Sequence, residues 1–112
     1  MVNSIAKGKA GEREFSKFLR DHGYADARRG QQFNGLDGED VIGLPGIHIE
    51  CKRVEHLNIH DAMAQSVRDA DEGIIPIVAH RKNRTEWLVT MRAEDFLRMT
   101  DNKKVIDNLG FL

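Results

Sequence analysis

The chain has 112 residues, of which 40% are hydrophobic and 31% charged, and its formal net charge is −1. This composition is ordinary for one soluble globular domain, and no apolar run approaches the ~18 residues of a membrane span. The polar N-terminus lacks the apolar core of a signal peptide, and the single cysteine, Cys51, excludes an intramolecular disulfide and a cysteine zinc cluster. We therefore expect one domain over residues 1–112 that makes no membrane contact. It would lie in the cytoplasm, or in the host cytoplasm if a phage encodes it.

The charges are distributed unevenly along the chain. Residues 1–34 carry a net charge of +3, residues 35–72 carry −6 and residues 73–112 carry +2. Such a pattern is compatible with ordinary surface composition. It is also compatible with an acidic metal centre between two segments that contact phosphate groups.

Three helices and five strands are predicted. In chain order they are a helix over about 4–22, a weak strand at 24–29, strands at 40–44 and 47–54, a helix over about 59–71, strands at 74–80 and 86–91, and a short helix over 93–99. Asn58 resembles a helix N-cap, and Gly73 stops the chain after the middle helix. This α-β-β-β-α-β-β-α order predicts an α/β fold with a mixed central sheet flanked by helices.

The segment "DVIGLPGIHIECKR" contains the two central predicted strands and an unusual set of polar residues. Pro45-Gly46 favours a tight turn, so the two strands would form a hairpin. Alternation places His48, Glu50 and Lys52 on one face of the second strand. Asp40, at the first position of the other strand, would lie close to Glu50 across the pair.

This arrangement offers hard oxygen ligands of the kind that Mg²⁺ binds. The ion takes one or two carboxylates together with water and substrate phosphate. Asp40 and Glu50 would supply the carboxylates, and the backbone carbonyl of Cys51 a third oxygen. Lys52 would orient a water molecule or stabilise charge on the phosphate in the transition state. The alternative interpretation is a solvated strand face with a weak salt bridge.

Two motifs resemble a known family. Asp40, Glu50 and Lys52 are similar to the D…ExK motif of the PD-(D/E)xK nucleases, although Glu39 stands where these enzymes commonly have proline. The segment "KGKAGER" (7–13) resembles the opening helix of archaeal-type Holliday junction resolvases. The resemblance covers roughly residues 5–72. It implies a restriction-endonuclease-like fold and a Mg²⁺ ion, for which Mn²⁺ would substitute.

The resemblance also implies roles for two helical residues. The metal-associated glutamate of the opening helix would be Glu12. Helical geometry alone leaves Glu14 open, because the two lie roughly 70° and 90° from the centre of the apolar face. A polar residue of the middle helix faces the active site in similar nucleases, which implies Gln65. The expected catalytic set is Glu12, Asp40, Glu50, Lys52 and Gln65, with Asp40, Glu50, Glu12 and the Cys51 carbonyl as metal ligands.

Basic residues in several segments are expected to contact DNA. In the resembled family a glycine-rich loop reaches over the DNA near the cleaved phosphate, and such contacts carry most of the affinity that is independent of sequence. The expected DNA-binding residues are Lys7, Lys9, Arg28, Arg29, Gln31, Arg53, Arg81, Lys82 and Arg84. His48 would sit beside the site, and the roles of His56 and His60 stay open.

The sequence thus predicts a metal-dependent DNA endonuclease of the Holliday-junction-resolvase type, acting on branched or duplex DNA. A homodimer is expected, because a four-way junction presents two strands to cut symmetrically. The apolar C-terminal segment 105–112 or the middle helix would form the interface. Two alternatives stay open: a nickase, flap nuclease or duplex endonuclease of phage or mobile-element type, and a non-catalytic DNA-binding or interaction module.

Overall fold

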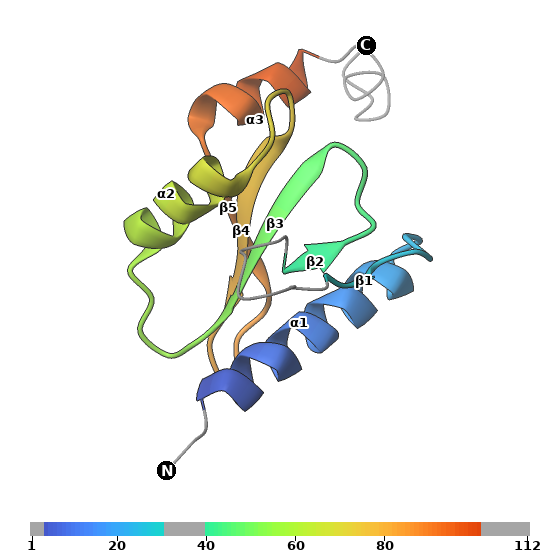
Figure 1. Ribbon diagram of the computed structural model, residues 1–112, viewed down its shortest axis with the longest axis vertical. Helices are drawn as coiled ribbons and strands as arrows, with labels where there is room; N and C mark the ends of the chain where they lie inside the picture. The colour runs from blue at the N-terminus through green and yellow to red at the C-terminus, as the bar shows by residue number, and fades with distance from the viewer. Residues whose placement is uncertain (1–3, 31–39, 102–112) are drawn as a thin grey trace.

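A computed structural model describes residues 4–30 and 40–101, with the side chains among them from Gly8 onward. Figure 1 shows how the helices are arranged around one sheet. The elements are α1 (Ser4–Asp21), β1 (Arg28–Arg29), β2 (Val41–Ile42), β3 (Ile47–Arg53), α2 (Ile59–Asp69), β4 (Ile75–Arg81), β5 (Leu88–Met91) and α3 (Ala93–Thr100). The predictions that concern Gln31, the rest of the 31–39 segment, the side chain of Lys7 and the C-terminal segment lie outside this description.

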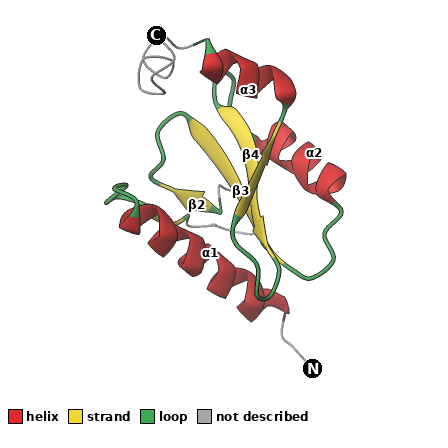
Figure 2. Cartoon of the chain, turned by 180° about the vertical axis from the view of Figure 1, so that it is seen from behind, coloured by secondary structure: helices red, strands yellow, loops and turns green. Residues whose placement is uncertain are grey.

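The five strands form one mixed sheet in the order β1-β2-β3-β4-β5. Only β3 and β4 are parallel, and the other neighbours are antiparallel. A parallel pair needs a crossover connection, which α2 provides. Helix α1 packs on one face of the sheet and α2 on the other (Figure 2). The prediction of an α/β domain with a mixed sheet and flanking helices is therefore confirmed.

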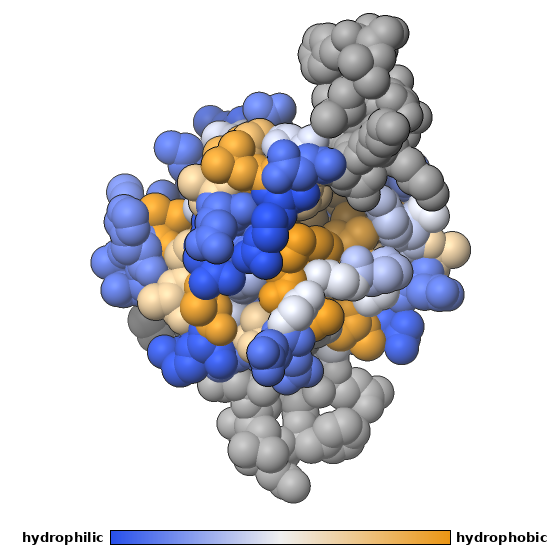
Figure 3. Space-filling view, turned by 90° about the horizontal axis from the view of Figure 1, so that it is seen from above, coloured by the Kyte–Doolittle hydropathy of each residue, from blue (hydrophilic) through white to orange (hydrophobic). Residues whose placement is uncertain are grey.

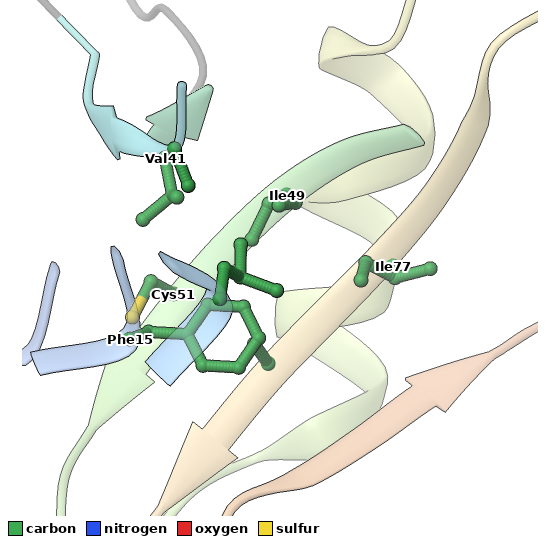
Figure 4. Close-up of a cluster of buried hydrophobic side chains, with 8 residues drawn as sticks. Phe15, Val41, Ile49, Cys51 and Ile77 are labelled. Atoms are coloured by element: carbon green, nitrogen blue, oxygen red, sulfur yellow. The ribbon is translucent and has the colours of Figure 1, made fainter. Parts of the chain in front are cut away.

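The main core lies between α1 and the sheet. Phe15 of α1 contacts a layer that includes Val41, Ile49, Cys51 and Ile77 (Figure 4), and Val41 and Ile49 have no exposed surface. These strand residues share one face because side chains alternate along a strand and the register pairs Val41 with Ile49 and Ile49 with Ile77. This layer fixes where the opposite faces of β2 and β3 point.

The β2–β3 hairpin forms as the sequence predicts. Gly46 adopts a φ of 78°, a conformation that glycine takes without a steric penalty. Gly43 also has a positive φ, and a Cβ there would lie 2.5 Å from the Asp26 carbonyl oxygen, so only glycine fits. The hairpin brings Asp40, just before β2, back beside the middle of β3.

Helix α2 starts and packs in a way that its sequence explains. The Asn58 side chain accepts a hydrogen bond from the Asp61 amide at 3.1 Å, which is the predicted N-cap. Ala62 and Ser66 face the sheet and are buried, and the Ser66 hydroxyl donates to the Ile77 carbonyl at 2.8 Å. The helix therefore covers the polar face of β3, which a solvated-face interpretation would leave open to water.

Several large apolar side chains remain exposed on β5 and α3. Leu88 is 50% exposed, Val89 53%, Phe96 53% and Leu97 58%. Figure 3 views the molecule from the end where α3 lies and shows apolar surface between polar groups. These residues lie on an edge strand and the helix that follows it, and Leu88 and Val89, as neighbours in β5, face opposite sides of the sheet.

Candidate active site

Asp40 and Glu50 meet at the open end of the β2–β3 hairpin. The register that pairs Val41 with Ile49, carried one residue outward, sets Asp40 beside Glu50. The Asp40 amide donates to the Ile49 carbonyl at 3.2 Å, and the Asp40 Oδ2 atom accepts from the Cys51 amide at 2.8 Å. The backbone of β3 therefore holds the Asp40 carboxylate in place at both its main chain and its side chain.

Glu50 is buried, Asp40 is partly buried, and the two carboxyl groups lie close together. Glu50 is only 1% exposed. Burial raises the pKa of Asp40 from 3.8 to about 7, and the negative charge of Glu50 adds to this rise, while the hydrogen bond from Cys51 opposes it. Placing two acids in such a site does not stabilise the fold, because ionisation of one carboxyl group makes ionisation of the other less favourable. Pairs of this kind are common where a protein binds a cation or handles protons.

Helix α1 supplies a third acid near this pair. The sequence did not decide whether this acid is Glu12 or Glu14, and the structure distinguishes them. The charge of Glu12 contributes to the raised pKa of Asp40, so Glu12 lies near the pair. Its Oε2 atom accepts from Arg29 Nε at 2.9 Å. Glu14 instead pairs with Arg53 and Arg81. Of the two, Glu12 is the glutamate beside Asp40.

Cys51 contributes its backbone rather than its thiol. The sulfur lies in the core, and burial, followed by the charge of Asp40, raises the pKa of the thiol far above its usual range. A neutral buried thiol is a poor nucleophile and metal ligand. In an extended strand the amide and carbonyl of one residue point to the same neighbour, so the Cys51 carbonyl faces the edge of β3 where Asp40 lies.

Lys52 extends from the same strand toward helix α2. Its Nζ atom donates to Oε1 of Gln65 at 3.4 Å, so the predicted catalytic lysine and the predicted helix glutamine are in contact. Both are only partly exposed. The amide therefore holds a long, flexible ammonium group on the side of the sheet where Glu50 lies.

His48 occupies the position two residues before Glu50 on the same face. It is 2% exposed, and its Nε2 atom lies 3.3 Å from Glu50 Oε1. The second oxygen, Glu50 Oε2, is buried and has no hydrogen-bond partner among the described residues. His56 and His60 are exposed at the start of α2 and lie apart from this contact.

These atoms fit a hard divalent cation that needs few protein ligands. Within residues 4–30 and 40–101, no group of three or more His, Cys, Asp or Glu side chains is arranged to hold a metal ion. Mg²⁺ does not require such a group, since it keeps several waters and binds through one or two carboxylates and substrate phosphate. The unpartnered Glu50 Oε2 atom, the adjacent Asp40 carboxylate and the Cys51 carbonyl are suitable donors.

The predicted DNA-binding residues divide into two groups. Lys9, Arg28, Lys82 and Arg84 are exposed. Arg29 is bound to Glu12, and Arg53 and Arg81 are both bound to Glu14. The charges of this second group are partly neutralised inside the protein, so they are less suited to direct phosphate contacts than the exposed group.

Comparisons with known proteins add no family to this description. No family model, no curated protein and no solved structure matches the chain. Among the described residues, no helix is long and apolar enough to cross a membrane.

Sequence reasoning missed the cluster of Glu14, Arg53 and Arg81. The register pairs Arg53 with Arg81 at the ends of β3 and β4, where Glu14 of α1 reaches both. Two arginines at the ends of consecutive parallel strands were a usable signal, because parallel neighbours in register bring them side by side.

Proposed function

We propose that this protein is a metal-dependent endonuclease that hydrolyses DNA phosphodiester bonds, with a restriction-endonuclease-like fold and a Holliday-junction-resolvase-like selectivity for branched DNA. The observation that carries the proposal is the pair of the partly buried Asp40, held by the Cys51 amide, and the buried Glu50, with Lys52 on the same strand as Glu50. The D…ExK spacing and the "KGKAGER" helix support the nuclease class.

Each residue of the cluster has a distinct role in this proposal. Asp40, Glu50 and the Cys51 carbonyl would hold Mg²⁺, which when bound would activate a water and neutralise charge on the phosphate. Lys52 positions the attacking water and stabilises negative charge that develops on the phosphate oxygens. Gln65 orients the lysine through their 3.4 Å contact. Glu12, whose carboxylate Arg29 fixes, would assist through the metal or through a water molecule.

The electrostatics favour a cation site over a purely structural cluster. Ionised Asp40, Glu50 and Glu12 would place three negative charges near one another, while Arg29 pairs with Glu12 and Lys52 contacts Gln65. Neither cation forms a described salt bridge with the Asp40–Glu50 pair. A divalent ion would restore the balance, since burying like charges without a counter-ion is costly.

The DNA substrate is proposed from the exposed basic residues and the site's chemistry. Lys9, Arg28, Lys82 and Arg84 are available for backbone phosphates, and such contacts give binding that depends on salt rather than on base sequence. A two-fold dimer belongs to the proposal, because symmetric cutting needs two sites. The exposed apolar residues of β5 and α3 offer surface for a second copy, which sedimentation velocity would detect as a concentration-dependent dimer.

A cleavage assay tests the proposed function. Labelled four-way junction, flap, nicked and linear duplex DNA are incubated with the protein in Mg²⁺ or EDTA. Glu50→Gln removes one proposed ligand charge at nearly constant volume. Glu72→Gln removes an exposed carboxylate in the α2–β4 connection and serves as the matched control. We expect cutting that requires Mg²⁺, is abolished by Glu50→Gln and is unchanged by Glu72→Gln.

The pattern of products separates the alternatives. Symmetric cuts confined to the four-way junction support the resolvase proposal, whereas cutting of flap, nicked or linear DNA indicates another nuclease specificity. Binding to DNA without cutting, under all these conditions, would indicate a non-catalytic module. Cutting that persists in Glu50→Gln would refute the proposed site.

A further inference from the structure

His48 is a histidine buried inside the sheet–helix layer. Its side chain is 3% exposed, and that of Glu50, which it contacts, is 1% exposed. His48 pairs with Pro76 across the parallel β3–β4 ladder, and α2 covers this face of the sheet. Strand pairing and helix packing therefore limit where the imidazole can point.

Packing alone does not explain a histidine at this position. A buried polar ring costs free energy unless its polar atoms are hydrogen-bonded, and an aliphatic side chain of similar volume would fill the same space without that cost. One contact that histidine makes here is Nε2 to Glu50 Oε1, at 3.3 Å. An imidazole Nε2–H group can donate to that oxygen, and an aliphatic group cannot.

The two oxygens of Glu50 have different surroundings. Oε1 has the imidazole as its partner, whereas Oε2 is buried with no hydrogen-bond partner among the described residues. A carboxylate with one oxygen fixed and the other unsatisfied has a defined orientation and one oxygen left to ligate. Ligating carboxylates are commonly fixed in this way by a second group that does not touch the metal.

We propose that His48 is a positioning residue: its Nε2–H group holds Glu50 Oε1 and so presents Oε2 to a divalent cation. This inference rests on the proposed metal site, and it adds a residue that the D…ExK pattern does not contain. His48 does not touch the substrate or the cation. It acts through the orientation of Glu50.

A pair of substitutions separates the hydrogen bond from the volume of the side chain. His48→Leu removes the donor and keeps a side chain of similar size, and His48→Gln restores an N–H donor. Mn²⁺ affinity, measured from the electron paramagnetic resonance signal of the free ion, is the main readout. We expect the affinity to fall about tenfold in His48→Leu, at the lower end of the effect of such partners, and to recover largely in His48→Gln.

Ser66→Ala is the matched control for the loss of a buried hydrogen bond. Ser66 is fully buried in the same layer, and its hydroxyl donates to the Ile77 carbonyl rather than to an acid. Thermal unfolding of all three variants gives the loss of stability. A structural role for His48 predicts that His48→Leu and Ser66→Ala both lower stability and leave Mn²⁺ affinity unchanged.

A measurement on the unaltered protein keeps the inference testable if His48→Leu fails to fold. ¹⁵N NMR of the imidazole, assigned through the backbone of β3, reports which ring nitrogen carries the proton. We expect Nε2 to be protonated and to donate. An unprotonated Nε2 that accepts a hydrogen bond from a protonated Glu50 would overturn the inference.

The outcomes also distinguish this inference from the proposed function. If the unaltered protein binds no Mn²⁺ and cuts no DNA, the proposed metal site itself is wrong. If the unaltered protein binds Mn²⁺ and His48→Leu binds it equally well, only the positioning role fails.

Discussion

Two charge clusters share helix α1 and strand β3 but differ in the balance of their positive and negative charges. In the acidic cluster, Glu12 of α1 lies near Asp40 and Glu50. In the arginine cluster, Glu14, two residues further along α1, binds Arg53 and Arg81. Both clusters join a glutamate of the first helix to residues of β3. The first gathers like charges, and the second pairs opposite ones.

The arginine cluster has the features of a structural clamp. It joins α1 to the ends of two parallel strands, and Gly11 permits the close approach, since a Cβ there would lie 2.5 Å from the Arg53 Cβ. The acidic cluster has no such explanation, because its charges oppose folding. The comparison indicates that the arginine cluster stabilises the fold, and it motivates the proposal that the acidic cluster binds a cation.

The largest expected effect is the loss of cleavage in Glu50→Gln. We expect the rate of DNA cutting to fall about a thousandfold, because a metal that polarises phosphate is worth several kcal/mol and each 1.4 kcal/mol is tenfold. Removal of a buried charge should leave the free energy of unfolding unchanged or higher. Single-turnover cleavage and urea denaturation measure the two quantities. A variant that loses both activity and stability would contradict the division between the clusters.

The next effect concerns pH and Asp40, whose pKa is raised from 3.8 to about 7. The folded protein keeps a proton that the unfolded chain releases, so this contribution to stability is full below about pH 4 and is lost as pH rises to about 7. Asp40→Asn removes that dependence and keeps an acceptor for the Cys51 amide. Between pH 5 and 8, wild type should lose up to about 3 kcal/mol more stability than the variant. The free energy of unfolding is measured by urea denaturation at each pH. An equal change with pH in wild type and in the variant would contradict the raised pKa of Asp40.

A smaller effect is expected from the arginine cluster. Glu14→Gln leaves two arginines without their carboxylate and should lower the free energy of unfolding by about 2 kcal/mol, less than for a fully buried pair because Glu14 is partly exposed. Mn²⁺ affinity should be unchanged. Glu72→Gln is again the control. A loss of Mn²⁺ binding in Glu14→Gln without loss of stability would reverse the roles of the two glutamates.

The smallest effect is expected from Gln65, which contacts the lysine rather than the acids. Gln65→Leu should lower the rate of the cleavage step by about tenfold, because the ammonium group loses its acceptor and samples other positions. Mn²⁺ affinity should stay the same. A Gln65→Glu variant, which keeps an acceptor oxygen, should retain more activity than Gln65→Leu if orientation of Lys52 is the role.

Local sequence signals were sufficient for much of the fold. The Asn58 cap, the Pro45-Gly46 turn and the alternation in β3 predicted α2, the hairpin and the core face correctly, because each depends on neighbouring residues. Pro76 is the second residue of β4, which lies between β3 and β5 in the sheet. The order of strands in the sheet depends on contacts between residues that are far apart in the sequence, and local sequence patterns do not determine these contacts.

The sequence predicted which residues meet at the candidate site better than it predicted how deeply they are buried. The hairpin turn implied that Asp40 approaches Glu50, and the structure brings them together. The alternation of side chains in β3 did not show whether the face that carries His48 and Glu50 is exposed to solvent. In the structure both residues are buried. A helix that connects two parallel strands must cover the sheet, so α2 was the missing signal. The choice between Glu12 and Glu14 needed the positions of their arginine partners.

Isothermal titration with Mn²⁺ at pH 7.5 is the most direct test of the central claim, that the acidic cluster is a cation site. Wild type and Glu14→Gln should each bind with the same affinity, and Glu50→Gln should show no saturable binding under the same conditions. Because the pKa of Asp40 is about 7, binding at this pH should release about a quarter of a proton per site, which appears as a heat that depends on the buffer. Saturable binding of equal strength in Glu50→Gln, or none in wild type, would contradict the claim.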